Sequence, residues 1–507
     1  MTPWPPALPA KLHPIVRDFL DSPDAVADTL TKFGSPVHLV FPQVFSENLV
    51  RLRSPLQRSL PGHRICYAHK VNQSRAFVRT AERAGVAIDV ASSHELSSAL
   101  GAGFDRARIE VTGPKGEAFL RDLVQRGVTI NVDNLWELRR IAELADGPAE
   151  IRVLLRVSGF DPGQVSRFGV PVAHVEQAFD LLSAQRGRIA FLGFAFHLDS
   201  GDLGERVRAV DACLRLIEQA YDRGLSPSVL DIGGGFRQVF TADAERFDAY
   251  VLALRESLLG RAEPMSWGSN TFGYHVAGGA VHGTPVFHKY ANTVSADRML
   301  ADLLGAPLER HGGRTVAQVV GDNLLEVWLE PGKALVDHAG VTVAAVEFVK
   351  EVADGSVLVH VDLSRDSVTP ADQEVMVDPI LLPRTGVGLD HTGENTEGPV
   401  GVYFAGRLCL ERDLITNHKV WLPTRPQPGD PVVFPNTAAY HMDLSAATAS
   451  MHPLPAKLAV TQGSGGFRVV RDADYEPDLP GEPSRPRDLA PPAVHAVTSP
   501  VRSVEAP

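Results

Sequence analysis

ICYAHKVNQSRAFVRTAERAGVAIDV, residues 65–90, contains one complete strand–helix–strand unit. Two short apolar runs, Ile65–His69 and Val86–Val90, are typical of buried strands. The amphipathic segment Ser74–Ala84 between them predicts a helix that covers the sheet. Two strands separated by a helix pair in parallel through a right-handed crossover.

The same alternation continues from about residue 60 to about residue 345. Further strands are expected at Arg108–Thr112, Val128–Val132, Ile151–Val157, Ala190–Phe196, Ser228–Ile232 and Leu324–Leu329. Further helices are expected at Asn134–Ala145, Val175–Ala184 and Arg206–Asp222. Strand–helix repeats in this number predict an α/β fold with a closed (β/α)8 barrel of the TIM type, in preference to an open doubly wound sheet.

The chain is too long for one ordinary core, so we expect more than one domain. The barrel is expected over residues 45–345, and an antiparallel β-domain, rich in β-branched runs, over 346–470. The N-terminal segment 1–44 contains the strand Val37–Phe41, which is expected to join the sheet of the β-domain. The tail 471–507 is rich in Pro and charged residues, which predicts disorder.

The interval between the expected seventh and eighth strands is longer than one crossover requires. We therefore expect an insertion at about residues 261–314. Its Gly, His and aromatic content fits a lid over an active site, and a surface elaboration is the alternative.

The bulk composition narrows the class of partner. A formal net charge of −12 argues against binding nucleic acid or an anionic membrane surface. No apolar run approaches the length of a membrane span, and the start MTPWPP lacks the features of an export signal. Cys66, Cys213 and Cys409 form no CxxC pair, so we expect no disulfide framework, no zinc site and a cytoplasmic location.

Polar residues gather where the expected barrel strands end. Lys70 closes the first strand, and TIM-barrel active sites lie at the carboxyl ends of the strands. We expect desolvation to lower the pKa of Lys70 and to favour the neutral amine that imine formation needs. A single strand-end lysine is otherwise an ordinary solvated charge. Further candidates at the same rim are Ser92, Arg156, His197, Ser200, Gly233, Gly234, Gly235, Glu330 and Lys333.

These residue types suit the parts of an aromatic phosphate cofactor. The glycines at 233–235 allow backbone N–H groups to approach a phosphate closely. The imidazole of His197 can stack on a ring, and Glu330 can keep a pyridine nitrogen protonated. A protonated pyridine stabilises a carbanion at Cα after CO₂ leaves. Alone, such a histidine is usually a core residue and such a glycine run usually a turn, but their common position at one rim favours a site.

With these motifs the chain resembles the fold-type III decarboxylases that depend on pyridoxal phosphate (PLP), a family that includes ornithine, arginine and diaminopimelate decarboxylases. The resemblance runs from about Ser35 to about Pro455. Its motifs are YAHKVN (67–72), DVASSHEL (89–96), INVDNLWEL (130–138), SRFGV (166–170), FHLDSG (196–201), DIGGGF (231–236), EPGK (330–333), GRLCLERD (406–413) and NTAAY (436–440).

The resemblance implies roles for single residues. Lys70 would hold PLP as a Schiff base, His197 would stack on the ring and Glu330 would pair with the pyridine nitrogen. Ser200, the glycines at 233–235 and Tyr440 would hold the phosphate, and Ser92 and Arg156 complete the expected cofactor set. The resemblance also implies a homodimer with shared active sites, in which Cys409 acts as the acid that protonates the product. A small buried hydrophobe is the alternative for Cys409.

Departures from the family pattern concern the substrate. Leu410 follows the cysteine where an acidic residue is usual, with Glu411 and Asp413 beyond it. Lys333 replaces the arginine of EPGR, and Asp199 replaces the glycine of FHxGS. The usual Gly-Ala-Tyr is Ala-Ala-Tyr at 438–440. With Lys333, Glu411 and Asp413 as substrate contacts, we expect a specialised decarboxylase of a diamino or conjugated amino acid in a biosynthetic pathway.

Two other functions fit the same barrel. A racemase of this fold places arginine at the pyridine nitrogen, so Glu330 favours decarboxylation. A non-catalytic regulator that binds a true decarboxylase would have lost the lysine or the cysteine, and this chain has both Lys70 and Cys409. A PLP-free TIM-barrel enzyme would need separate explanations for the lysine, the glutamate and the glycine run.

Overall fold

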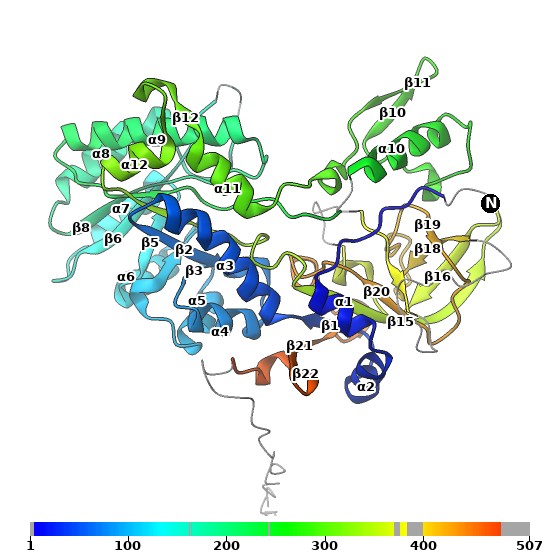
Figure 1. Cartoon of the computed structure of the whole chain (residues 1–507). Helices are drawn as coiled ribbons and strands as arrows, with labels where there is room; N and C mark the ends of the chain where they lie inside the picture. Colours follow the sequence, from blue (N-terminus) through cyan, green and yellow to red (C-terminus); the bar gives the residue numbers. More distant parts are fainter. Residues whose placement is uncertain are drawn as a thin grey trace, which may run out of the picture.

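The computed structural model describes residues 5–161, 163, 165–241, 244–369, 376–382 and 399–477. Figure 1 shows two bodies side by side, a barrel covered by helices and a β-domain with a smaller subdomain next to it. Among the described residues, no helix is both long and apolar enough to cross a bilayer.

Parallel strands form the closed barrel. Their order is β5-β4-β3-β2-β14-β9-β8-β6, and β6 also pairs with β5, so the sheet returns to its start. The expected (β/α)8 barrel is therefore confirmed. Its strands are β2 (His63–Ala68), β3 (Ala87–Val90), β4 (Ile109–Val111), β5 (Thr129–Val132), β6 (Ile151–Ser158), β8 (Ile189–Ala195), β9 (Val229–Asp231) and β14 (Glu326–Leu329).

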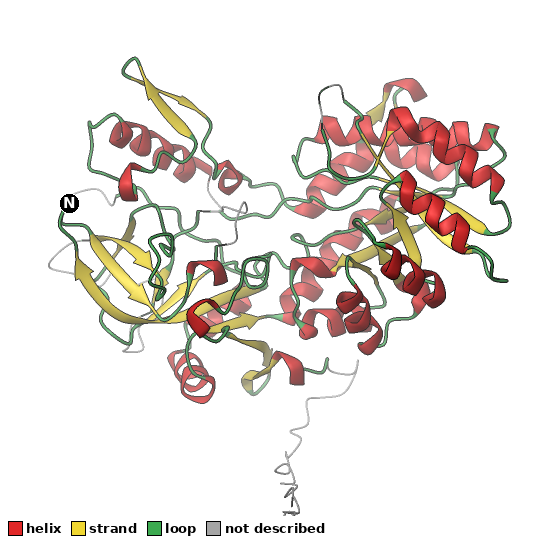
Figure 2. Ribbon diagram, turned by 180° about the vertical axis from the view of Figure 1, so that it is seen from behind, coloured by secondary structure: helices red, strands yellow, loops and turns green. Residues whose placement is uncertain are grey.

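Helices surround the strands, as Figure 2 shows in red around yellow. They are α3 (Pro42–Ser59), α4 (Arg75–Arg83), α5 (Ser93–Gly101), α6 (Glu117–Arg126), α7 (Leu135–Leu144), α8 (Val175–Ala184), α9 (Leu203–Asp222), α11 (Ala296–Gly305) and α12 (Val316–Asp322). Side-chain caps start several of them: Ser74 accepts from Phe77 N at 3.3 Å, and Asp202 accepts from Glu205 N at 3.0 Å. Each cap comes a few residues after a strand end, so it fixes the loop that carries the rim residues.

The second body is a mostly antiparallel sheet. Its order is β19-β18-β16-β15-β1-β21-β22, with β20 on β15 and β17 on β20. The N-terminal strand β1 lies between β15, to which it is antiparallel, and β21, to which it is parallel. The strands are β1 (Val37–Val40), β15 (Gly340–Glu351), β16 (Val357–Val361), β17 (Ile380–Leu381), β18 (Val400–Ala405), β19 (Val420–Leu422), β20 (Pro431–Phe434), β21 (Ala456–Gly463) and β22 (Gly466–Arg471).

A subdomain leaves the barrel between β9 and β14. It contains α10 (Ala244–Leu258), the hairpin β10 (Tyr274–Ala277) and β11 (Ala280–Gly283), and the short helix η5 (His288–Ala291). It docks on the β-domain, because Trp267 N donates to Asn417 O at 2.8 Å and Lys419 N donates to Met265 O at 2.9 Å. Its own apolar cluster includes Tyr250. Figure 1 shows the subdomain above β18 and β19.

The expected bounds of the insertion, 261–314, differ from the structure. Helix α10 already belongs to the subdomain, whereas α11 packs against α3 and α9 in the outer layer of the barrel. The buried face of α11, with Leu300 and Leu303, contributes to the barrel core. The segment that leaves the barrel therefore begins earlier and ends earlier than expected.

Ordered chain continues past the expected start of the tail at residue 471. Asp472 is buried and its carboxylate accepts from the backbone N–H of Arg75 at 2.8 Å and of Ala76 at 3.0 Å. These donors are at the start of α4, so the end of the β-domain is tied to the barrel. Residues 478–507 of the expected disordered tail lie outside the described residues.

Candidate active site

Lys70 lies directly after β2, in the short helix η1 (His69–Val71). Its Nζ is 2.9 Å from Oδ2 of the buried Asp89, and Asp89 Oδ1 accepts from Thr112 Oγ1 at 2.6 Å. Desolvation alone would lower the pKa of Lys70, but the charges of Asp89 and Glu330 outweigh it and raise the pKa. The expected lowered pKa is therefore wrong for this state, because the neighbouring strand supplies a counter-ion.

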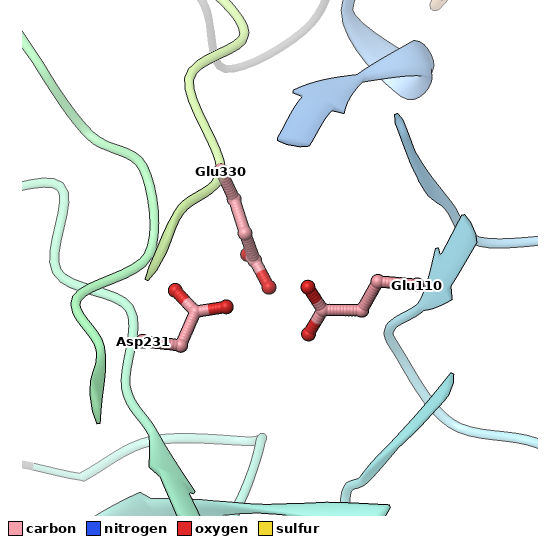
Figure 3. A group of neighbouring side chains, drawn as sticks. All are labelled: Glu110, Asp231 and Glu330. Atoms are coloured by element: carbon pink, nitrogen blue, oxygen red, sulfur yellow. The ribbon is translucent and has the colours of Figure 1, made fainter. Parts of the chain in front are cut away.

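Three buried carboxyl groups meet inside the barrel (Figure 3). Glu110 comes from β4, Asp231 from the end of β9, and Glu330 follows β14. One oxygen of each lies within 4.8 Å of one oxygen of each of the others. Asn131 Nδ2 donates to Glu110 Oε1 at 2.9 Å and to Glu330 Oε1 at 3.3 Å, so the amide bridges two of the three groups.

These carboxyl groups do not share the charge equally. Burial, together with the neighbouring carboxylates, raises the pKa values of Glu110 and Asp231 well above their ordinary values. Burial would also raise the pKa of Glu330, but His197 and Lys70 outweigh it and the pKa is lowered. Glu330 is therefore the member of the three that ionises most readily, and Glu110 and Asp231 hold a proton more tightly than ordinary carboxyl groups.

His197 covers this anion from the mouth of the barrel. Its Nδ1 is 3.9 Å from Glu330 Oε2 and accepts a hydrogen bond from Gly234 N at 3.3 Å. The ring thus lies between the glycine turn and the carboxylate, with 30 % of its side chain exposed. A flat ring in this position can lie against an aromatic cofactor, as the sequence predicts.

The glycine turn after β9 is tightly packed. Gly233 and Gly235 have φ values of +66° and +74°, which favour glycine. A Cβ on Gly235 would lie 1.8 Å from Leu198 O, and one on Gly234 would lie 2.4 Å from Glu330 O. Side chains are therefore excluded, and the backbone itself forms the wall of the site.

Arg206 holds this turn from below and was not predicted from the sequence. It is a fully buried residue of α9 whose guanidinium donates to Leu198 O at 2.6 Å, to Ile232 O at 3.3 Å and to Gly234 O. Burial lowers its pKa to about 10, so it remains charged at neutral pH. The only signal in the sequence is an arginine in the first turn of an amphipathic helix, which is usually a solvated residue.

Other predicted cofactor residues have contacts of their own. Arg156 Nη1 is 3.8 Å from Asp133 Oδ1, and its guanidinium lies over the Phe168 ring at 4.7 Å. Ser200 Oγ contacts Glu205 and accepts from Asp202 N at 3.2 Å.

Two further predicted residues also make backbone contacts. Ser92 accepts from Glu95 N at 3.2 Å and caps α5. Tyr440, with φ of +69°, donates its N–H to Val71 O at 2.8 Å, which brings the β-domain next to Lys70. Ser92 therefore starts a helix at the rim, and Tyr440 borders the lysine loop.

Asp199 and Lys333, two residues that differ from the family pattern, contact each other. Lys333 Nζ is 2.7 Å from Oδ1 and 3.0 Å from Oδ2 of Asp199. A cavity of about 330 Å³ lies beside this pair and is bordered by Ser200 and Gly235. A second cavity, of about 320 Å³, is bordered by Arg156 and His197 and shares Asp199 and Ser200 with the first. Both openings are at the mouth of the barrel.

The cysteine loop belongs to the β-domain, between β18 and β19. Cys409 is exposed, and Leu410 is 48 % exposed. Asp413, predicted to contact the substrate, is buried and accepts from the N–H groups of Arg365 at 2.6 Å and Leu408 at 2.7 Å. Its carboxylate therefore shapes the loop that presents Cys409. Glu411, the other acidic candidate, is exposed.

The donor set fits a phosphorylated pyridine aldehyde. An amine, an ionised carboxylate and a flat imidazole meet at one rim, and beside them a glycine turn opens onto a cavity with lysine in its wall. The pKa of the buried Glu330 is lowered by His197 and Lys70, so this carboxylate suits a cationic partner. The amine matches the aldehyde, the carboxylate matches the ring nitrogen, and the imidazole matches the face of the ring. The glycine turn and its cavity match the phosphate.

Comparison with known proteins agrees with this geometry. Residues 47–266 match the pyridoxal binding domain of the pyridoxal-dependent decarboxylases. The uncharacterized protein y4yA of Sinorhizobium fredii is 33% identical over 483 residues, which cover 92% of this chain and 96% of the relative. Diaminopimelate decarboxylase of Bacillus subtilis is 25% identical over 469 residues, which cover 88% and 90% of the two chains.

A solved structure shows the same fold. Diaminopimelate decarboxylase from M. jannaschii, in co-complex with L-lysine, aligns with a TM-score of 0.65 and 17% sequence identity. The alignment covers 88% of this chain and 91% of that chain.

Proposed function

This chain belongs to the fold-type III, PLP-dependent decarboxylases, and we propose from that premise that it removes CO₂ from an amino acid with Lys70 as the Schiff-base lysine. The supporting observation is the arrangement of the Lys70 amine, the ionised Glu330 and the imidazole of His197 at one rim. PLP, when bound, supplies an electron sink for the electron pair that the departing CO₂ leaves at Cα.

The residues of the chain prepare this chemistry in distinct ways. Glu330, a buried carboxyl group with a lowered pKa, would hold a proton at the pyridine nitrogen. Asp89 would form an ion pair with Lys70 when that amine is protonated, since Asp89 Oδ2 is 2.9 Å from Lys70 Nζ. His197 would cover one face of the ring and exclude water, and the turn at Gly233–Gly235, with Ser200, would receive the phosphate.

The proton that replaces CO₂ would come from Cys409. The thiol is exposed on a loop of the β-domain, so we propose that it enters the site of a second subunit and that the enzyme is a homodimer with shared sites. The exposed Glu411 would face the far end of the substrate, which favours a diamino or conjugated amino acid with a cationic end. Asp413 would act on the loop alone, since its oxygens already accept from the backbone.

A CO₂-release screen over basic, acidic and diamino substrates, with the chirality of the remaining amino acid recorded, tests this function. We expect bound cofactor to give an absorbance that Lys70→Ala removes together with activity. Cys409→Ala should keep the absorbance and impair product protonation. Chirality change without CO₂ release would indicate a racemase, and a wild-type protein without cofactor absorbance in added PLP would contradict the proposal.

A further inference from the structure

Asp199 has two lysine partners that come from different parts of the chain. Lys333, in the loop after β14, lies 2.7 Å and 3.0 Å from its two oxygens. Lys289, in η5 of the subdomain, lies 3.7 Å from Oδ2. Burial would raise the pKa of Asp199, but the two lysines outweigh it and lower the pKa, so the carboxylate is ionised at neutral pH.

This group borders the cavity of about 330 Å³ at the phosphate end of the site. The same cavity is lined by Ser200 and Gly235, the predicted phosphate contacts, and by Arg237. Arg237 is itself fixed, because it donates to Gly201 O at 2.6 Å and to Asn292 Oδ1 at 3.5 Å. Apart from histidines, the described residues of the lining include three cations and one carboxylate.

A phosphate that enters this cavity meets a carboxylate of its own sign. Lys333 cannot serve both anions fully, since two of its three N–H donors face Asp199. If Lys289 neutralises Asp199, the remaining two cations match the charge of a phosphate, which is about −2. Without Lys289 the cavity would have one positive charge too few.

We propose that the subdomain contributes to the cofactor site through Lys289, which acts as a positioning residue. Lys289 pairs with Asp199 in place of Lys333, so that Lys333 can bind the phosphate of the cofactor. This inference rests on the proposed function, because it takes PLP as the ligand. It gives the subdomain a role at the mouth of the barrel, in addition to its backbone hydrogen bonds to the β-domain at Met265 and Trp267.

The test compares the affinity of the cofactor-depleted full chain for PLP and for pyridoxal, which lacks the phosphate, by absorbance titration. Lys289→Met keeps the apolar stem and removes the charge, and Asp199→Asn removes the carboxylate at similar size. Lys350→Met, at an exposed lysine of β15, is the matched control. A double variant that combines Lys289→Met with Asp199→Asn completes a double-mutant cycle.

We expect Lys289→Met to weaken PLP binding by about tenfold, the effect of one charge-assisted hydrogen bond, and to leave pyridoxal binding unchanged. Asp199→Asn should not weaken PLP binding, and in the double variant it should restore the affinity that Lys289→Met loses. The control should bind both ligands like the wild type.

Three outcomes would overturn the inference: unchanged PLP affinity in Lys289→Met, equal loss of PLP and pyridoxal, or no rescue by Asp199→Asn. If Lys289→Met does not fold, Asp199→Asn alone decides, since a weaker PLP affinity in that variant contradicts the inference. A wild-type chain that binds neither ligand would instead contradict the proposed function, so the two failures are distinguishable.

Discussion

Glu110→Gln tests whether the cluster of Glu110, Asp231 and Glu330 carries a single negative charge. Two ionised carboxylates 4.8 Å apart, the upper limit for this group, repel by roughly 3.5 kcal/mol at an effective dielectric constant of about 20. Three ionised groups would make three such pairs and cost roughly 10 kcal/mol. That is comparable to the whole stability of a domain, and even one ionised pair costs roughly 3.5 kcal/mol, so the state with protons on two of the groups is favoured.

The pH dependence of stability follows from the raised pKa of Glu110, caused by burial and then by Asp231. Since the folded chain holds this proton more tightly than the unfolded chain, the contribution of Glu110 to stability is complete below its unfolded pKa of about 4.3. It is lost as the pH rises through the raised, folded pKa. Glutamine cannot titrate, so its free energy of unfolding lacks this loss. As the pH rises through that window, the free energy of unfolding of Glu110→Gln minus that of the wild type should increase by about 1.4 kcal/mol per pH unit.

Urea unfolding at several pH values between about 5 and 8, followed by tryptophan fluorescence and circular dichroism, measures this difference. Glu351→Gln, at an exposed glutamate of β15, is the control and should run parallel to the wild type. Glutamine also keeps an oxygen for Asn131, so the side-chain contact survives. Parallel curves for Glu110→Gln and the wild type would refute a single charge on this cluster.

Three further changes probe the site and its support. Glu330→Gln should retain the cofactor absorbance but lower kcat by about 100-fold, or roughly 2.7 kcal/mol, in a CO₂-release assay. Arg206→Met leaves three buried carbonyl groups without their donor and should lower the free energy of unfolding by about 3 kcal/mol, as a fall in the urea midpoint. Asp472→Ala removes the acceptor for Arg75 N and Ala76 N and should cost about 1–2 kcal/mol in the same assay.

The sequence predicts the rim because strand ends in a parallel barrel face one way. Lys70, His197 and Glu330 each follow a strand, so their common location needs only the order of strands and helices. Glu110 was missed although a signal existed, since a charged residue in an apolar barrel strand must point into a polar interior or out to a helix.

Interactions between distant strands were harder to predict. The pKa of Lys70 depends on Asp89 of the next strand. The sequence pattern of β2 does not indicate how close the Lys70 amine lies to the Asp89 carboxylate. The expected bounds of the insertion are wrong because they include α11. This helix has the apolar face of a barrel helix and packs against α3 and α9. Asp413 was expected at the substrate, but its backbone contacts form only after the loop has folded.

The barrel interior also explains why the pKa of Glu330 is lowered whereas those of Glu110 and Asp231 are raised. Glu330 follows its strand at the mouth, where Lys70 and His197 stabilise the anion. Glu110 and Asp231 affect the pKa of the buried Cys66 more than Glu330 does, and Cys66 belongs to an apolar layer that includes Trp328. Position along the strand thus accounts for the opposite directions of these pKa shifts. A substitution that brings a cation to this layer should ionise Glu110 or Asp231 and weaken the hold of Glu330 on its own cationic partner.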